Sequence, residues 1–290
     1  MKKKIVVLSL FVCSLSFAHA QLLWKVSGNG LKYTSYLFGT HHLIPIQFLD
    51  SVPGLYKAFN ACGVVVGEMV MSNVDATAKI QQAAIMPDHK TMKDLLSDDK
   101  YKVVDTELKS VLKFGLKELS IMNPALILTL YEMELYKKQI KLSDDKQSDS
   151  YFQLVAAEKG MKVIGLETIE QQIDVLFKNG TLNRQAELLY ETIQQKDSVL
   201  TEMGHLNKLY KGGKLDELVV LSKGAGSVTD ITADEYAKLV DNRNANWLTK
   251  FPDLMKDSPC FIAVGALHLA GPNGLIKQLE KAGYKVKPVE

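Results

Sequence analysis

The stretch SYLFGTHHLI, residues 35–44, is a short apolar strand that ends at a glycine and is followed by two adjacent histidines, His41 and His42. Near the other end of the chain, residues 260–270 read CFIAVGALHLA, where another apolar strand ends at a glycine and His268 follows. Both stretches have the form of a strand and then G-x-x-H. This repeated form indicates that two strand ends, far apart in the sequence, belong to one site.

Two further apolar strands end in the same way, next to a glutamate. The run VVVG is followed directly by Glu68, and the run MKVIGL by Glu167. Runs that are apolar on both faces are typical of buried parallel strands, and strands alternating with helical patterns predict an α/β fold with a mostly parallel central sheet. Because functional groups gather beyond the carboxyl ends of such strands, we expect His42, Glu68, Glu167 and His268 at one edge of the sheet.

The helical patterns are longer than simple connections between neighbouring strands require. Apolar residues recur at three- and four-residue spacing through much of the chain between the strands. We therefore expect a single α/β domain over residues 21–290, with helical insertions at about 73–158 and 169–250.

The first twenty residues have the pattern of a signal peptide. Three lysines precede an apolar run at 5–17, and an A-x-A cleavage signal ends at Ala20. The alternative is a membrane anchor, but the run is shorter than the roughly 20 residues that a spanning helix needs. We expect an exported protein, periplasmic or secreted, cleaved near Ala20 and with no membrane span in the mature chain.

Composition excludes some classes of partner. The chain has 290 residues, 47% of them hydrophobic, and a formal net charge of +2, which does not point to nucleic acid.

Cys62 and Cys260 remain after cleavage, each five residues before a strand-end glycine. If their strands are parallel neighbours, the two cysteines are expected to lie level, as a disulfide or as two buried thiols.

The predicted edge carries the residue types of a metal site. Two histidines with one or two carboxylates suit a divalent ion that keeps an open coordination position, such as zinc, manganese, cobalt or iron. Such an ion lowers the pKa of bound water, and the remaining carboxylate of Glu68 or Glu167 serves as general base. Arg243 is a candidate to hold a substrate carboxylate or an oxyanion.

Each of these residues also has a structural interpretation. A histidine at a strand end is often structural, and Glu68 could simply end its strand in solvent. Glu167 could favour the start of the next helix, and Arg243 could form a surface pair with Asp241. The duplicated G-x-x-H favours a shared site over these separate explanations.

A family resemblance adds to this interpretation. LLWKVSGNGLKYTSYLFGTHHLIP, VVVGE, GLET, RNANW and VGALHLAGPNGLI occur in the order in which the TraB/GumN family has them, over nearly all of residues 21–290. The chain resembles that family, which includes the TIKI metalloproteases, and its fold is similar to that of erythromycin-esterase-like and ChaN-like proteins. The resemblance implies a manganese or cobalt ion held by His42, Glu68 and His268, with Arg243 in support. His41 occupies the variable position of G-T-x-H, and the role of Glu167 is left open.

The expected function is an exported metal-dependent hydrolase of the peptidase type that acts on a peptide or an exposed protein segment. Glu68 or Glu167 would handle the proton, and Arg243 would orient the substrate. Two alternatives stay open. One is a periplasmic binding protein for a peptide, metal or haem without turnover. The other is a metal-independent, esterase-like hydrolase. The sequence does not indicate the oligomeric state.

Overall fold

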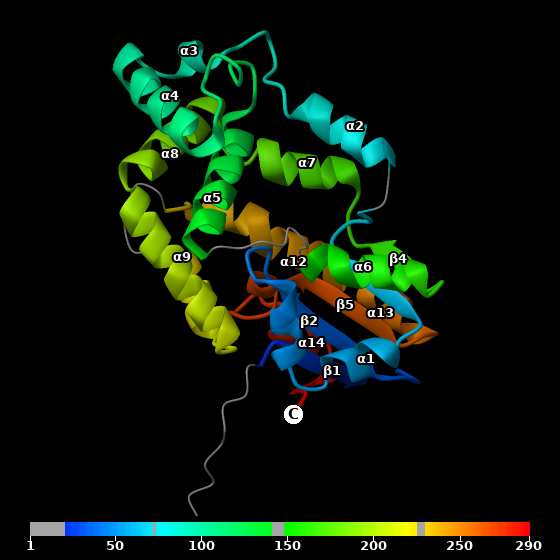
Figure 1. The fold of residues 1–290 in the computed structure, drawn as a ribbon. Coiled ribbons are helices and arrows are strands. Elements are labelled where there is room, and N and C mark those ends of the chain that lie inside the picture. Colours follow the sequence, from blue (N-terminus) through cyan, green and yellow to red (C-terminus); the bar gives the residue numbers. More distant parts are fainter. Residues whose placement is uncertain (1–20, 72–73, 141–147, 225–229) are drawn as a thin grey trace, which may run out of the picture.

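A six-stranded sheet forms the centre of the computed structural model, which describes residues 21–71, 74–140, 148–224 and 230–290 (Figure 1). The expected signal peptide, residues 1–20, lies outside the described residues. In space the strands follow the order β4-β3-β5-β2-β1-β6. Their bounds are β1 (Leu23–Gly28), β2 (Ser35–Thr40), β3 (Val64–Gly67), β4 (Lys162–Gly165), β5 (Cys260–Gly265) and β6 (Tyr284–Pro288).

The four strands that end in the predicted motifs are parallel neighbours. β2 and β3 flank β5, and β4 lies beyond β3. The register pairs Thr40 with Gly265 and Gly67 with Gly165, so these strands end at one edge of the sheet. β1 is antiparallel to both β2 and β6, which makes the sheet mixed. The predicted α/β fold with a mostly parallel sheet is confirmed.

Most helices lie between β3 and β5 in the sequence. The segment between β3 and β4 holds α2 to α6, and the segment between β4 and β5 holds α7 to α13. The bounds are α1 (Leu55–Asn60), α2 (Val74–Ala83), α3 (Met92–Leu95), α4 (Asp98–Leu112), α5 (Pro124–Ile140), α6 (Ser148–Glu158), α7 (Ile169–Phe177), α8 (Leu182–Gln194), α9 (Lys196–Lys211), α10 (Leu215–Ser222), α11 (Ala233–Tyr236), α12 (Asn242–Leu248), α13 (Phe251–Lys256) and α14 (Leu275–Lys281).

Aromatic packing fixes α1 and α6 against the sheet. Phe59 of α1 and Phe152 of α6 meet Phe261 of β5, with ring centroids 5.4 and 4.8 Å apart, respectively. Phe38 of β2 joins them at 5.6 Å from Phe152. Full burial of each such ring stabilises the fold by roughly 1.5–3 kcal/mol. The sheet that carries the strand-end residues is therefore a rigid support.

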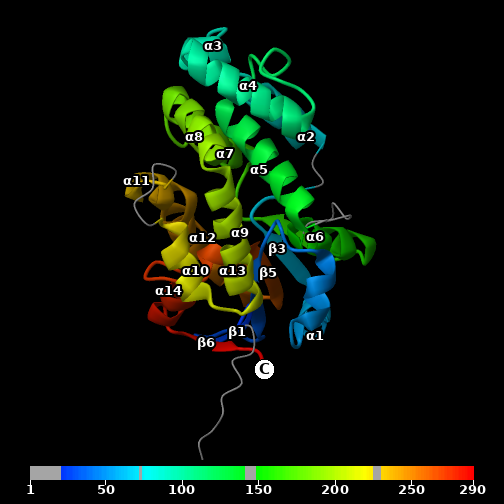
Figure 2. The ribbon, with the colours of Figure 1, turned by 60° about the vertical axis from the view of Figure 1, so that its left-hand side comes forward.

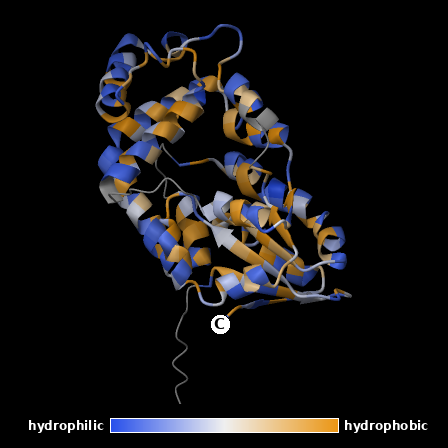
Figure 3. Cartoon of the chain, turned by 45° about the vertical axis from the view of Figure 1, so that its right-hand side comes forward, coloured by the Kyte–Doolittle hydropathy of each residue, from blue (hydrophilic) through white to orange (hydrophobic). Residues whose placement is uncertain are grey.

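A second apolar cluster holds α3, α4, α5 and α8 together in the upper part of Figure 1, separately from the core around the sheet. It includes Leu108 of α4, Ile127 and Tyr131 of α5, and Leu189 of α8, all fully buried. Figure 2 shows the same helices beside one another from a second direction. In Figure 3 the strands are largely hydrophobic, whereas many helices carry hydrophilic residues along one side.

The two cysteines are neighbours without being level. Cys260 pairs in register with Val64, so Cys62 precedes the level position by two residues, and the expected alignment was wrong. The equal spacing to the two glycines misled the prediction because β5 runs two residues further than β3 before its glycine. Both cysteines are buried free thiols, which is the second of the two expected alternatives.

In the described part of the chain, no helix combines the length and the apolar character that crossing a bilayer requires.

Candidate functional site

Glu68 and His268 meet at the carboxyl ends of β3 and β5. Glu68 follows β3 directly, and His268 ends the 3-10 turn η3 (Ala266–His268) that follows β5. Oε1 of Glu68 accepts a hydrogen bond from the backbone N–H of Gly265 at 2.9 Å and lies 3.8 Å from Nε2 of His268. A Cβ on Gly265 would lie 3.3 Å from that oxygen and 3.5 Å from the imidazole, so the glycine of this G-x-x-H permits the close approach.

Arg243 of α12 joins both glutamates to His268. Its Nη2 donates to Oε2 of Glu68 at 2.5 Å and to Oε2 of Glu167 at 3.0 Å. Its Nε donates to Oε1 of Glu167 at 2.8 Å. Its Nη1 contacts Nε2 of His268 at 3.2 Å and donates to the Leu239 carbonyl at 3.0 Å. A guanidinium has five N–H donors, so protein groups engage all of them in this arrangement.

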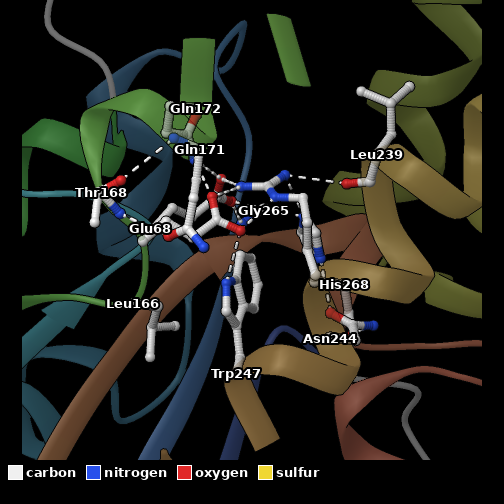
Figure 4. Close-up of polar contacts among 12 residues, drawn as sticks. Glu68, Leu166, Thr168, Gln171, Gln172, Leu239, Asn244, Trp247, Gly265 and His268 are labelled. Carbon is white, nitrogen blue, oxygen red and sulfur yellow. Dashed lines mark hydrogen bonds and ion pairs between the residues drawn. The ribbon is translucent and has the colours of Figure 1, made fainter. Parts of the chain in front are cut away.

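Glu167 lies deeper than Glu68. Its side chain is 5% exposed, whereas that of Glu68 is 26% exposed. Besides the two bonds from Arg243, it accepts one from Nε1 of Trp247 at 2.9 Å and one from Nε2 of Gln172 at 2.6 Å (Figure 4). These contacts make Glu167 the anchor of Arg243, and they leave Glu68 as the glutamate that reaches solvent.

Asn244 determines which nitrogen of His268 carries the proton. Its Nδ2 donates to the carbonyls of His268 and Asn273, at 3.1 and 2.9 Å, so its Oδ1 is an acceptor. That oxygen lies 2.8 Å from Nδ1 of His268. Nδ1 is therefore the donor, and Nε2 carries the lone pair that faces Arg243 and Glu68. Figure 4 shows Asn244 beside His268.

The surroundings determine the protonation states of His268 and Glu68. Burial lowers the pKa of His268 to about 4, with Arg243 acting in the same direction and Glu68 in the opposite one. Burial by itself raises the pKa of Glu68, but the electrostatic effects of His268 and Arg243 and the Gly265 N–H lower it to about 2. At neutral pH His268 is thus a neutral imidazole, and Glu68 is a carboxylate.

Trp247 closes the other side of the cluster. It lies one helical turn after Arg243 on α12, and it is fully buried. Its ring centroid is 4.3 Å from that of His268, and the guanidinium carbon of Arg243 lies 4.8 Å from the Trp247 ring. The i, i+4 spacing of Arg243 and Trp247 in the sequence is the signal that both face the same partner.

His42 does not form a three-ligand metal set with Glu68 and His268 in the described part of the chain. Among His, Cys, Asp and Glu side chains of the described residues, no three are arranged to hold a metal ion, so His42 does not join Glu68 and His268 in such a set. His42 is exposed in the loop after β2. His41 is half-buried: its Nδ1 accepts from the Leu43 N–H at 3.0 Å, and its ring packs on Tyr210 at 5.0 Å.

The predicted residues are therefore brought together in part. Glu68, Glu167, Arg243 and His268 converge from four segments that are far apart in the sequence, and among the described residues His42 does not complete a metal-binding set with Glu68 and His268. Asn244, Trp247 and Gln172 belong to the cluster, although sequence reasoning assigned them no role. RNANW carried a usable signal, because Asn244 and Trp247 flank Arg243 on one helix. Gln172 carried none.

Glu68 and His268 fit a divalent cation as a pair of ligands. A metal ligand must be deprotonated, and the neutral imidazole and the ionised carboxylate meet this condition. Two donor atoms at about 2.0–2.2 Å from one ion lie at most about 4.3 Å apart. The 3.8 Å between Nε2 and Oε1 is within this limit. Asn244 accepts from the opposite ring nitrogen, as the outer partners of metal-binding histidines do.

The chain belongs to the TraB/PrgY/gumN family, which it matches over residues 22–288. No curated protein matches the chain. No solved structure matches it either.

Proposed function

We propose that this TraB/PrgY/gumN protein is a metal-dependent hydrolase whose centre is formed by Glu68 and His268. The observation that carries the proposal is the pair itself: a neutral Nε2 lone pair and an ionised carboxylate, 3.8 Å apart at the ends of adjacent parallel strands. When bound, a divalent cation such as manganese, cobalt or zinc supplies Lewis-acid chemistry, that is, polarisation of a carbonyl oxygen and acidification of water.

Each residue of the proposed site has a distinct role. Glu68 and His268 hold the cation, and His42 is the proposed third ligand, contributed by the loop after β2. Asn244 keeps the proton on Nδ1, so that Nε2 stays a donor of its lone pair. Glu167 holds Arg243 in place through two hydrogen bonds. Trp247 covers the imidazole and excludes water from that side.

Arg243 acts as a positioning residue in this arrangement. From its sequence position we expected Arg243 to bind a substrate carboxylate or an oxyanion. All five of its donors instead contact protein groups. We propose that it holds Glu68 and His268 in position before an ion binds, and that it balances the charge of the two glutamates.

The substrate class that we propose, a peptide or an exposed protein segment, rests on the resemblance to the TIKI metalloproteases. Export to the periplasm or the exterior is likewise a proposal, and it rests on the basic, apolar and A-x-A pattern of residues 1–20.

The saturated hydrogen bonding of the cluster favours one alternative, a binding protein without turnover, because each donor of Arg243 already has a partner. A metal-independent esterase-like mechanism is less favoured. A general base is most effective with a pKa near the working pH, and the pKa of His268 is about 4.

Turnover of a peptide mixture tests the proposal. The chain, purified without chelators, is incubated with the peptides and manganese, cobalt or zinc, and products are identified by mass spectrometry. We expect cleavage that EDTA abolishes. The variants His268→Ala and Glu68→Gln should both lose this cleavage. The control variant His205→Ala, on the exposed face of α9, should retain it. Full cleavage in EDTA contradicts the metal mechanism, and no cleavage with any ion supports the binding protein.

A further inference from the structure

The guanidinium of Arg243 contacts the same pair of residues that a divalent cation would use. Its Nη1 donates to Nε2 of His268 at 3.2 Å, and its Nη2 donates to Glu68 at 2.5 Å. Because Asn244 accepts the proton of Nδ1, Nε2 has the only lone pair that the ring offers in its plane. That lone pair either accepts the hydrogen bond from Arg243 or binds an ion.

Charge repulsion also prevents Arg243 and an ion from occupying Nε2 of His268 together. A cation bound at Nε2 would lie within a few ångströms of a guanidinium that is itself 10% exposed and poorly screened by water. Two positive charges at such a separation repel each other strongly in a buried site. The contacts of Arg243 to His268 and Glu68 must therefore break before an ion binds there.

The other contacts of Arg243 do not involve the ligand pair. Glu167 accepts from Nε and Nη2, the Leu239 carbonyl accepts from Nη1, and the guanidinium lies over the ring of Trp247. These partners hold the guanidinium beside the site after its contacts to Glu68 and His268 have been broken. Arg243 can thus give way to an ion and return without leaving the protein interior.

We infer that Arg243 is a built-in competitor of the divalent cation at Glu68 and His268, so that its guanidinium sets the affinity of the folded chain for the ion. The inference rests on the metal-binding part of the proposed function, and it does not depend on turnover. It requires that removing the charge of Arg243 strengthens binding of the ion, although Arg243 belongs to the site.

Calorimetric titration with cobalt and zinc tests this inference. We expect Arg243→Gln to bind the ion at least tenfold more tightly than the unmodified chain, and the double variant Arg243→Gln, His268→Ala to lose this gain. The control is Arg184→Gln, because Arg184 is the only other arginine of the chain and pairs with Glu235 away from the site. Equal or weaker binding by Arg243→Gln, or no binding by either protein, overturns the inference.

A second measurement needs no substitution and remains valid if Arg243→Gln does not fold. With two arginines in the chain, selective ¹⁵N labelling gives two Nε–H signals, which the Arg184→Gln spectrum assigns. Saturation with zinc should shift or broaden the Arg243 signal and leave the Arg184 signal unchanged. An ion that binds in a His268-dependent way without changing the Arg243 signal overturns the inference.

These measurements separate the inference from the proposed function. Tighter binding by Arg243→Gln without any hydrolysis would support the competition and contradict the hydrolase. Metal-dependent hydrolysis combined with unchanged affinity in Arg243→Gln would support the hydrolase and contradict the competition.

Discussion

Glu68 combines two properties that its neighbours do not share: its pKa is about 2, and its side chain is the most exposed of the charged residues in the cluster, at 26%. Arg243, Glu167 and His268 have side chains that are 10%, 5% and 5% exposed. A ligand that enters from solvent therefore meets Glu68 first. Arg243 and Glu167 act through the position and the charge that they give to Glu68.

Removing the charge of Arg243 should destabilise the fold. Arg243→Gln leaves Glu68 and Glu167 without their common counter-charge, and loss of one partner of a buried ion pair costs about 3–5 kcal/mol. Urea unfolding without added metal measures the free energy. Arg184→Gln is the control and should cost less, because the Arg184 side chain is 30% exposed. Equal losses of unfolding free energy for the two variants would mean that the Arg243 network stabilises the fold no more than the Arg184 ion pair does.

The two adjacent histidines should respond in opposite ways to substitution. His41→Ala removes a ring that packs on Tyr210 and accepts the Leu43 N–H, so it should lower the unfolding free energy by roughly 1–2 kcal/mol. His42→Ala, in an exposed position, should cost less stability than His41→Ala and should weaken metal binding. Thermal unfolding and cobalt titration of both variants check this. If His41→Ala weakened cobalt binding and His42→Ala did not, His41 would be the metal ligand.

At the scale of the element, β5 shows why a glycine ends the strand. In Gly265→Ala the new methyl would lie 3.3 Å from Oε1 of Glu68, and it would push the carboxylate away from His268. We expect metal affinity to fall at least tenfold with little change in the folded state. Gly63→Ala is the matched control, since nothing lies within 4 Å of its Cβ position. Unchanged affinity in Gly265→Ala would show that the close approach is not required.

Helix α5 contains a carboxyl group with an unusual pKa. Burial raises the pKa of Glu132 from 4.5 to about 7. Because the folded state holds this proton more tightly than the unfolded state, the stabilisation is complete below about pH 4.5 and is lost as the pH rises through 7. The difference amounts to about 3 kcal/mol.

Glu132→Gln should remove this dependence on pH. The amide carries no charge at any pH, so the variant should be more stable than the unmodified chain at pH 8 by up to about 3 kcal/mol and similar to it at pH 4.5. Urea unfolding at both pH values measures the two free energies. A variant that is less stable at pH 8 would show that the Glu132 carboxylate has a favourable partner in the folded chain.

At the scale of the whole molecule, the gathering of Glu68, Glu167 and His268 follows from the sheet. Parallel strands that end in the same motif bring their final residues to one edge, and this much could be predicted from the strand patterns alone. The same argument explains why the α/β class was predicted correctly. It needs only apolar runs, their glycines and the helical segments between them.

The remaining features depend on packing between distant segments. The two-residue offset between Cys62 and Cys260 is a matter of register, which equal spacing along each strand does not reveal. The complete use of the Arg243 donors requires α12 to lie beside β3, β4 and β5, and no local pattern encodes that placement. The position of His42 depends on the conformation of a loop beyond the strand end, where periodicity gives no guidance.

Anomalous diffraction at the cobalt edge, from crystals of the unmodified chain soaked in cobalt, locates the ion in the folded protein. We expect one anomalous peak within bonding distance of Nε2 of His268 and the carboxylate of Glu68, with Nη1 of Arg243 withdrawn from His268. We also expect His42 to move to the peak as the third ligand. A cobalt peak elsewhere, with the contacts of Arg243 to Glu68 and His268 intact, would show that these residues do not form a metal centre.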